Sequence, residues 1–192
     1  KSSSNTETPT SRSSDRRCRP ISRTTADLQP FWSAAGYRTV CLGSRRDAVS
    51  GACAALVLKG LNQHTESLID DAATRFYRQL LVGLTEHWRA LEAAVVADLL
   101  AGAPALTCDA HDLNDVAAFV DGRRSYEHCL GGIYKAAVNR IASLPANQPL
   151  SLARQVLIER LLQKQSFARV AERHKLPGRA GVIKQLQEAL KL

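Results

Sequence analysis

Residues 67–101 read SLIDDAATRFYRQLLVGLTEHWRALEAAVVADLLA, and this stretch decides the fold that the sequence predicts. Apolar side chains recur every three or four positions from Leu68 to Leu99, which places them on one stripe of an α-helix. Ser67 and the acids behind it are typical of a helix start, and Gly102 is typical of a helix end. We therefore expect one uninterrupted helix over 67–101, a rod of about 50 Å along which other elements pack.

The rest of the chain shows shorter helical patterns and no sustained alternation of apolar and polar residues. Shorter helices are predicted over 47–61, 109–119, 123–144, 151–163, 166–174 and 179–190. The predicted fold is all-α, an irregular bundle of about six or seven helices around the long central helix, with an extended basic N-terminal tail.

Composition divides the chain into four segments. Residues 1–30 form an extended tail rich in Ser, Thr and Arg, and 31–46 form a linker anchored by Phe31 and Trp32, aromatics of the kind that dock a tail onto a body. The remaining segments are a helical body over 47–148, which holds the long helix, and a basic C-terminal helical hairpin over 149–192. No window is long and apolar enough to span a membrane.

Charge is unevenly distributed along the sequence. Residues 1–46 hold nine Lys/Arg against three Asp/Glu, residues 47–148 hold eight against twelve, and residues 149–192 hold nine against three, which gives +6, −4 and +6. Basic ends on an acidic middle indicate two contacts with anionic partners, although solvated helix faces would produce the same pattern. The tail cations predicted to bind a partner are Arg16, Arg17, Arg19 and Arg23.

The beginning of the sequence and its cysteines suggest a compartment. The chain starts at Lys1 instead of Met, and its head is rich in Arg and Ser and poor in acids, as in an organellar transit peptide. Five scattered cysteines without a Cys-x-x-Cys pair are typical of a reducing environment. These features favour a processed mitochondrial protein on the matrix side of the inner membrane.

Residues 166–190 resemble a helix-turn-helix, because two short helices flank a turn with apolar residues at positions that allow close crossing. In that interpretation Arg173, Arg179 and Lys184 contact nucleic acid. Lys175 stands in the turn where glycine is usual, and any short helical hairpin would give a similar pattern. The interpretations left open are contact with DNA, contact with RNA and a plain hairpin.

The hexapeptide Phe76-Tyr77-Arg78-Gln79-Leu80-Leu81 resembles the leucine-tyrosine-arginine signature of the LYR family, with Phe76 in place of the leucine. The resemblance implies a small three-helix mitochondrial adaptor that binds acyl carrier protein or sits in a respiratory complex. It also implies that Tyr77 and Arg78 face a partner.

Known motifs of catalysis are absent from the sequence: it contains no G-x-x-x-x-G-K-[ST], no G-x-G-x-x-G and no G-x-S-x-G. We accordingly assign no catalytic, cofactor-binding or metal-binding residue, and we expect a protein that is not an enzyme and needs no cofactor.

The sequence therefore favours a non-catalytic accessory subunit of a large mitochondrial assembly, a matrix-side peripheral subunit of ATP synthase or of a respiratory complex that scaffolds neighbouring subunits. Its expected partners are other subunits of that complex, with RNA as a possible further partner, and it is at most peripheral to the membrane. Two alternatives are a mitoribosomal protein with its basic ends on rRNA and a helix-turn-helix DNA-binding regulator.

Overall fold

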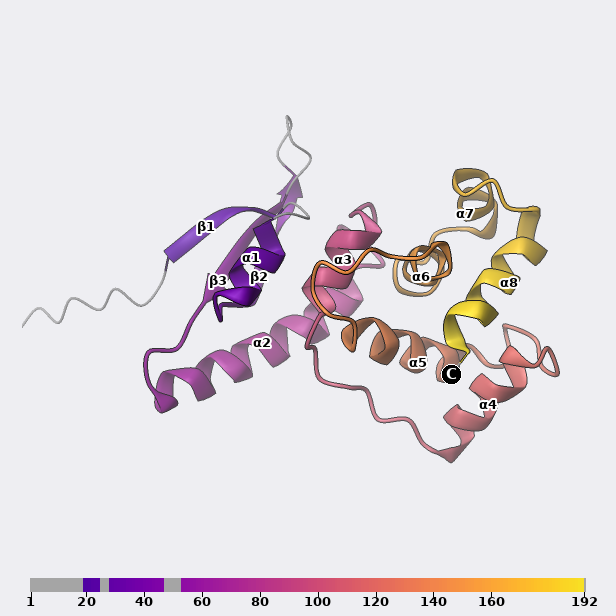
Figure 1. The fold of residues 1–192 in the computed structure, drawn as a ribbon, viewed down its shortest axis with the longest axis horizontal. Helices are drawn as coiled ribbons and strands as arrows, with labels where there is room; N and C mark the ends of the chain where they lie inside the picture. The colour runs from indigo at the N-terminus through magenta and orange to yellow at the C-terminus, as the bar shows by residue number, and fades with distance from the viewer. Residues whose placement is uncertain (1–18, 25–27, 47–52, 192) are drawn as a thin grey trace, which may run out of the picture.

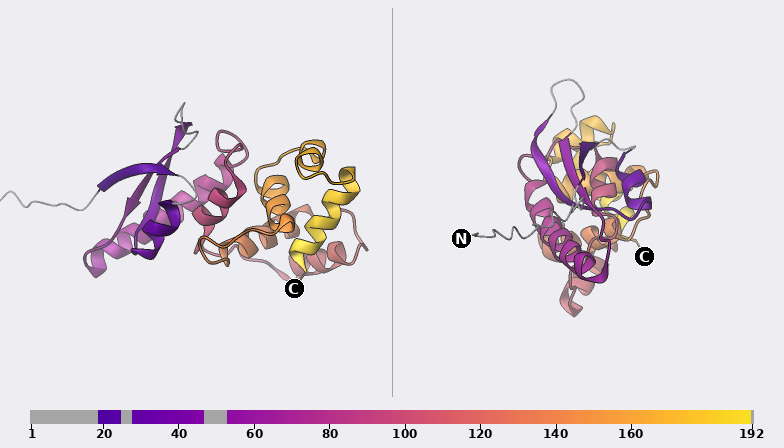
Figure 2. Two further views of the ribbon diagram at one scale, coloured as in Figure 1. Left: turned by 45° about the horizontal axis from the view of Figure 1, so that its top comes forward. Right: turned by 90° about the vertical axis from the view of Figure 1, so that its left-hand side faces the viewer.

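The computed structural model of the chain describes residues 19–24, 28–46 and 53–191. A small sheet with helices α1 and α2 lies at one end of an elongated molecule, helices α4 to α8 lie at the other, and α3 lies between them (Figures 1 and 2). In chain order the elements are β1 (Arg19–Thr24), α1 (Leu28–Ala34), β2 (Arg38–Arg46), β3 (Cys53–Leu58), α2 (Gln63–Gly83), α3 (Ala93–Leu100), α4 (Ala110–Val120), α5 (Leu130–Ala142), α6 (Leu152–Leu157), the π-helix η1 (Ile158–Leu162), α7 (Phe167–Arg173) and α8 (Gly178–Leu190).

The prediction of an all-α fold is wrong, because β1, β2 and β3 form an antiparallel sheet in the order β1-β3-β2. The central strand β3 covers residues that we expected to be helical. Its side chains alternate in burial: Cys53, Ala55 and Val57 are buried, while Ala54 and the half-buried Leu56 point the other way. Both faces of this strand are apolar, so the alternation is invisible in the sequence.

The prediction of one long helix over 67–101 is also wrong. Helix α2 begins four residues earlier, where Asn62 and Thr65 cap its first turn reciprocally, and it ends at Gly83. A series of turns follows, and α3 begins at Ala93. The stripe of apolar residues continues through the turns, since Leu84 is buried like the residues of α2. Periodicity alone therefore could not reveal the break.

Trp88 explains why the helix stops at Gly83. Its amide donates to the Gly83 carbonyl at 3.0 Å, and its ring packs so closely over Gly83 that a Cβ there would lie 2.3 Å from Cε3. The indole Nε1 donates to the Gly43 carbonyl at 3.0 Å, which ties the turn to β2. Glycine is thus the residue that lets the chain fold back under the tryptophan.

The remaining helices pack around a core of large aliphatic side chains. Leu157, Ile158, Leu161 and Leu162 of α6 and η1 are fully buried, with α8 on one side and α5 on another. The structure confirms the short helices predicted over 109–119, 166–174 and 179–190. The helix predicted over 123–144 begins only at Leu130, after a stretch of turns. No helix among the described residues is long and apolar enough to cross a bilayer.

Hydrogen bonds join the segment between α2 and α3 to the residues that follow η1. Gln163 Nε2 donates to the Leu91 carbonyl and Gln165 Nε2 donates to the Arg89 carbonyl, each at 2.7 Å. In return, the Arg89 guanidinium donates to the carbonyls of Gln163 and Lys164. We call this set of bonds the Arg89 clasp. It fixes the two ends of the molecule to each other through main-chain atoms.

Candidate functional site

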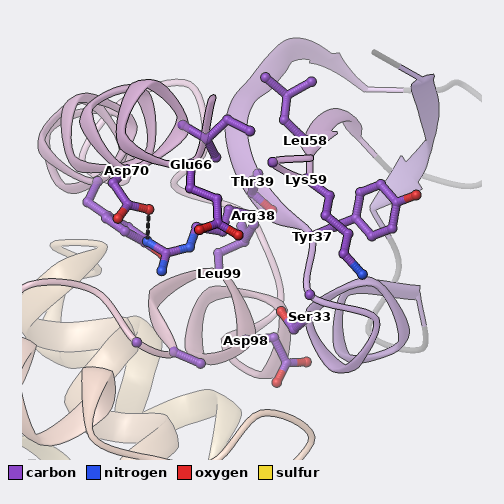
Figure 3. A pocket seen from close by; sticks show the side chains of 16 residues that line it. Ser33, Tyr37, Arg38, Thr39, Leu58, Lys59, Glu66, Asp70, Asp98 and Leu99 are labelled. Carbon is purple, nitrogen blue, oxygen red and sulfur yellow. Dashed lines mark ion pairs between the residues drawn. The ribbon is translucent and has the colours of Figure 1, made fainter. Parts of the chain in front are cut away.

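A large pocket of about 560 Å3 lies between the sheet, α2 and α3 (Figure 3). Arg38 comes from β2, Lys59 from the end of β3, Asp70 from α2 and Asp98 from α3. Polar side chains from the sheet, α2 and α3 thus converge on the pocket.

The charges around this pocket are largely paired. Arg38 and Asp70 form an ion pair at 2.6 Å, and the Lys59 ammonium donates to the Ala35 carbonyl at 2.8 Å. Asp98 accepts a hydrogen bond from the Asn147 amide at 2.7 Å. Burial raises the pKa of Asp98, and the bond from Asn147 opposes that rise. A pocket with this balance offers a polyanion little attraction.

A second candidate site is the hairpin of α7 and α8. Ser166 caps α7 by accepting a hydrogen bond from the Arg169 amide at 3.2 Å. Lys175 adopts the left-handed conformation with φ of 52°, and the Leu176 amide donates to the Ala171 carbonyl at 2.8 Å. This is the hydrogen bond of a Schellman helix end. Lys175 therefore fills the position where the sequence led us to expect glycine.

A buried carboxylate holds the end of α7. Glu159 of η1, which is 4% exposed, accepts hydrogen bonds from Arg173 at 2.9 Å and from His174 at 3.0 Å. A buried carboxylate without such partners would carry a large desolvation cost. The hairpin is consequently fixed to the π-helix by charge as well as by packing.

The start of α8 is held in a similar way. The Arg179 guanidinium is paired with Glu127, and that bond lowers the pKa of the glutamate. The Arg179 guanidinium also lies over the Phe167 ring, with its Cζ 4.3 Å from the ring centroid. The Cζ of Arg160 lies at the same distance from that centroid. Arg160 and Arg179 thus both contact Phe167 and fix the beginning of the hairpin.

The predicted nucleic-acid contacts divide into two groups. Arg173 and Arg179 are occupied by Glu159 and Glu127, whereas Lys184 makes no hydrogen bond or ion pair within the described part of the chain. Sequence reasoning missed other cations that are equally unpaired among the described residues. Those on α6, α7 and the turn are Arg154, Arg169 and Lys175. Their signal in the sequence was the excess of basic residues over 149–192.

Of the four tail arginines predicted to bind a partner, two lie in the described part of the chain. Arg16 and Arg17 fall outside the described residues. Arg19 and Arg23 lie in β1, where their backbones face Val57 and Ala54 of β3.

The aromatic anchor lies on α1. Phe31 is 61% exposed, while Trp32 is half-buried between Phe31 and Tyr37, at centroid distances of 5.2 and 5.0 Å. Trp32 Nε1 is buried without a hydrogen-bond partner among the described residues.

Tyr77 and Arg78 lie side by side in α2 but point to different surroundings. Tyr77 is half-buried and lines the large pocket, and burial raises the pKa of its hydroxyl against the opposing effect of Arg38. Arg78 is exposed. The structure therefore does not bring the two together as one contact surface.

Among the described residues, no three His, Cys, Asp or Glu side chains are grouped so that they could hold a metal ion.

No family model matches the chain. It is 38% identical over 172 residues to a tRNA(Met) cytidine acetyltransferase of Nitrosococcus halophilus, an alignment that covers 87% of this chain and 23% of that protein. The enzyme of the same name from Vibrio cholerae is 29% identical over 165 residues, which are 86% of this chain and 22% of that protein. The chain thus spans less than a quarter of the length of these curated relatives.

These similarities overturn the functional expectations. The relatives are named for an enzyme that acts on tRNA, so the expectation of a non-enzymatic subunit of ATP synthase, a respiratory complex or a mitoribosome is wrong, as is that of a DNA-binding regulator. The predicted partners, subunits of a large complex, are wrong for the same reason. A mitochondrial location is wrong because the relatives are bacterial proteins. The LYR resemblance covers six residues, whereas the similarity to the acetyltransferases covers most of the chain.

Proposed function

We propose that this chain is part of a tRNA(Met) cytidine acetyltransferase and that it contributes to tRNA binding. The observation that carries the proposal is the 38% identity over 87% of the chain to a protein of that name. Because the chain spans less than a quarter of that relative, the acetyl transfer is proposed for the longer protein. The contribution of this chain is inferred from its own charges and surfaces.

Four unpaired cations favour the α6–α8 region as the tRNA contact. Phosphate binding requires positive side chains that are not already neutralised by carboxylates. In the C-terminal part of the described chain Arg154, Arg169, Lys175 and Lys184 form no ion pair, although the charge of Glu188 acts on Lys184. Arg160 and Lys164 also lack a carboxylate partner, but they lie over the aromatic rings of Phe167 and Tyr134. By contrast, the cations at the large pocket are engaged by Asp70 or by a carbonyl.

The paired cations of the hairpin serve the same function indirectly. Arg173 with Glu159 and Arg179 with Glu127 hold α7 and α8 in place. A fixed hairpin presents Arg169, Lys175 and Lys184 at a smaller entropic cost on binding, because its backbone is already ordered. We therefore assign contact to the unpaired cations and positioning to Arg173 and Arg179.

Anisotropy of fluorescent tRNA(Met) titrated with the chain tests the contact. The variant carries Arg169→Ala, Lys175→Gly and Lys184→Ala, with glycine at 175 because φ is 52° there. We expect at least a tenfold weaker affinity at 100 mM salt, with a salt dependence shallower by about two to three released counterions.

The matched control removes three cations that already have carboxylate partners. Arg123, Arg124 and Lys191 pair with Asp121, Asp115 and Glu188. Their combined replacement by alanine changes the net charge by the same amount, so we expect a clearly smaller loss of affinity. Equal losses in the two triple variants would show that net charge, and no particular surface, governs binding.

The enzymatic part of the proposal is tested with the full-length protein. Nucleosides released from tRNA(Met) after incubation with an acetyl donor are analysed by mass spectrometry. A cytidine carrying one added acetyl group supports the proposal, and unmodified cytidine with a folded, tRNA-binding protein contradicts it.

A further inference from the structure

A second hollow lies on the outer side of α2, where the helix meets the turn that follows it. Its volume is about 450 Å3. Helix α2 contributes Arg78, Gln79 and Val82, and the turn contributes Glu86, His87 and Trp88. We refer to it as the α2 groove. The large pocket shares none of these residues.

The α2 groove has apolar and aromatic surfaces that are held rigidly. Val82 is 66% exposed, so its apolar side chain is accessible in the groove. Trp88 is fixed by its bond to the Gly43 carbonyl and by its packing over Gly83. The exposed His87 ring stands edge-to-face against the indole, at a centroid distance of 4.4 Å and an angle of 68°.

The rim of the groove carries unpaired positive charge. Arg78 of the lining makes no ion pair or hydrogen bond within the described part of the chain, and neither does Arg75, which lies one turn earlier on α2 and outside the lining. Gln79 and Glu86 add an amide and a carboxylate to the lining. The combination is an apolar cleft with an aromatic wall, one unpaired guanidinium group in its lining and a second one turn away on α2, and polar groups able to recognise a base edge.

We propose that the α2 groove binds an unstacked nucleobase of RNA, with the adjoining phosphates on Arg75 and Arg78. The proposal rests on the proposed function, because it assigns part of the same tRNA contact to a surface remote in sequence from α7 and α8. A nucleobase offers a π-face to His87 and Val82 and a polar edge to Gln79 and Glu86. Its phosphate supplies the anion that the guanidinium groups lack.

The shape of the groove selects single-stranded RNA over a duplex. Bases within a helix are stacked on each other and their faces are inaccessible, whereas loop bases can be splayed onto aromatic side chains. Stacking on an aromatic residue tolerates any base. Choice among bases would then come from Gln79 and Glu86.

Tryptophan fluorescence provides a direct test, because the chain has two tryptophans and only Trp88 lines the groove. In a Trp32→Phe background the emission reports Trp88 alone. We expect a single-stranded RNA of about ten nucleotides to quench this emission, and the same strand annealed to its complement to leave it unchanged. Anisotropy of the labelled RNA, measured in parallel, reports binding anywhere on the chain.

Two variants and one control locate the effect. Val82→Asp places a negative charge in the groove, and His87→Ala removes the aromatic wall; each should abolish the quench and weaken single-strand binding roughly tenfold. Leu113→Asp is the matched control, since Leu113 on α4 is 60% exposed and lies outside the groove. It should leave the quench intact.

The outcomes separate this proposal from the proposed function. RNA that binds by anisotropy without quenching Trp88 overturns the groove and leaves the hairpin contact standing. The absence of any RNA binding overturns both. If Val82→Asp leaves the RNA-induced quench of Trp88 unchanged, the occupant of the groove is not a nucleobase and the inference is wrong.

Discussion

The sheet end and the helical end of this molecule are stabilised by cores of different kinds. The sheet buries Cys53, Ala55 and Val57, which are small, together with Leu42. The largest fully buried side chains lie elsewhere, on α2 and on the helices from α3 onward. Hydrophobic stabilisation grows with the apolar area removed from water, so the helices contribute a larger reserve of stability than the three-stranded sheet.

The large pocket beside the sheet and the α7–α8 hairpin also differ in charge. At the sheet end, Arg38 of the large pocket is neutralised by Asp70. At the helical end, Arg169, Lys175 and Lys184 form no ion pair within the described chain, and the helices there pack around buried aliphatic side chains. These cations do not stabilise the fold through ion pairs, because the buried core supplies the stability. They can therefore bind an anionic ligand without loss of an internal ion pair.

Removal of a large side chain from each core is the strongest test of this comparison. Leu161 of η1 is fully buried among aliphatic neighbours, so Leu161→Ala should lower the free energy of unfolding by about 3 kcal/mol. Leu42→Ala in the sheet should cost about half as much, since a thin sheet can collapse around the space. Urea denaturation measures both, and equal costs would remove the distinction between the two ends.

A pair of glycines tests the link between the ends. Gly83→Ala would force Trp88 away and strain its bond to Gly43, so we expect a loss of about 2 kcal/mol. Gly131→Ala in α5 is the control: no atom outside its own helix lies within 4 Å of the added Cβ, and alanine should stabilise the helix by about 0.5 to 1 kcal/mol. Thermal unfolding distinguishes the two, and a gain at both positions would show that Trp88 is not fixed by Gly83.

The smallest effect concerns Asp98, which lies where the two ends meet. Its raised pKa means that the folded protein keeps the proton to a higher pH than the unfolded chain, so the free energy of unfolding falls as the pH rises from the unfolded pKa through the folded one. Asp98→Asn retains an oxygen that can accept from the Asn147 amide, and it should raise stability at pH 7 by on the order of 0.5 kcal/mol.

The pH dependence provides the check on that expectation. Below the unfolded pKa the wild type and Asp98→Asn should be equally stable, and the difference should grow through the titration range. A difference that is constant from pH 3 to 7 would show that the carboxylate is as well solvated in the folded protein as in the unfolded chain.

The helices that the sequence predicted well carry their signals locally. Helix α4 begins where Asp109 and Asp112 cap each other reciprocally, and α7 begins after the capping residue Ser166. The sequence did not predict strand β3, because Ala54 and Leu56 are apolar like their buried neighbours. Burial therefore alternates along the strand while polarity does not. The sequence did not predict the break after α2, because the break depends on the packing of Trp88 over Gly83, a tertiary contact.

The candidate sites were predictable to a similar degree. The basic C-terminal segment showed which part of the chain carries excess charge. Which cations are free depended on partners far away in sequence: Arg179 is separated by 52 residues from Glu127, and Arg173 by 14 from Glu159. The α2 groove could not be predicted from the sequence. It forms where the chain turns after α2, and the predicted straight helix has no turn between Val82 and Trp88.

The Arg89 clasp has a mechanical consequence. Its glutamine amides and guanidinium grip main-chain carbonyls on either side, so replacement of neighbouring side chains leaves its anchor points in place. Lys164, at the centre of this segment, has φ of 53°, a left-handed conformation that is unfavourable for a lysine. A displacement of the hairpin would therefore also displace the segment that follows α2, because these hydrogen bonds join the two.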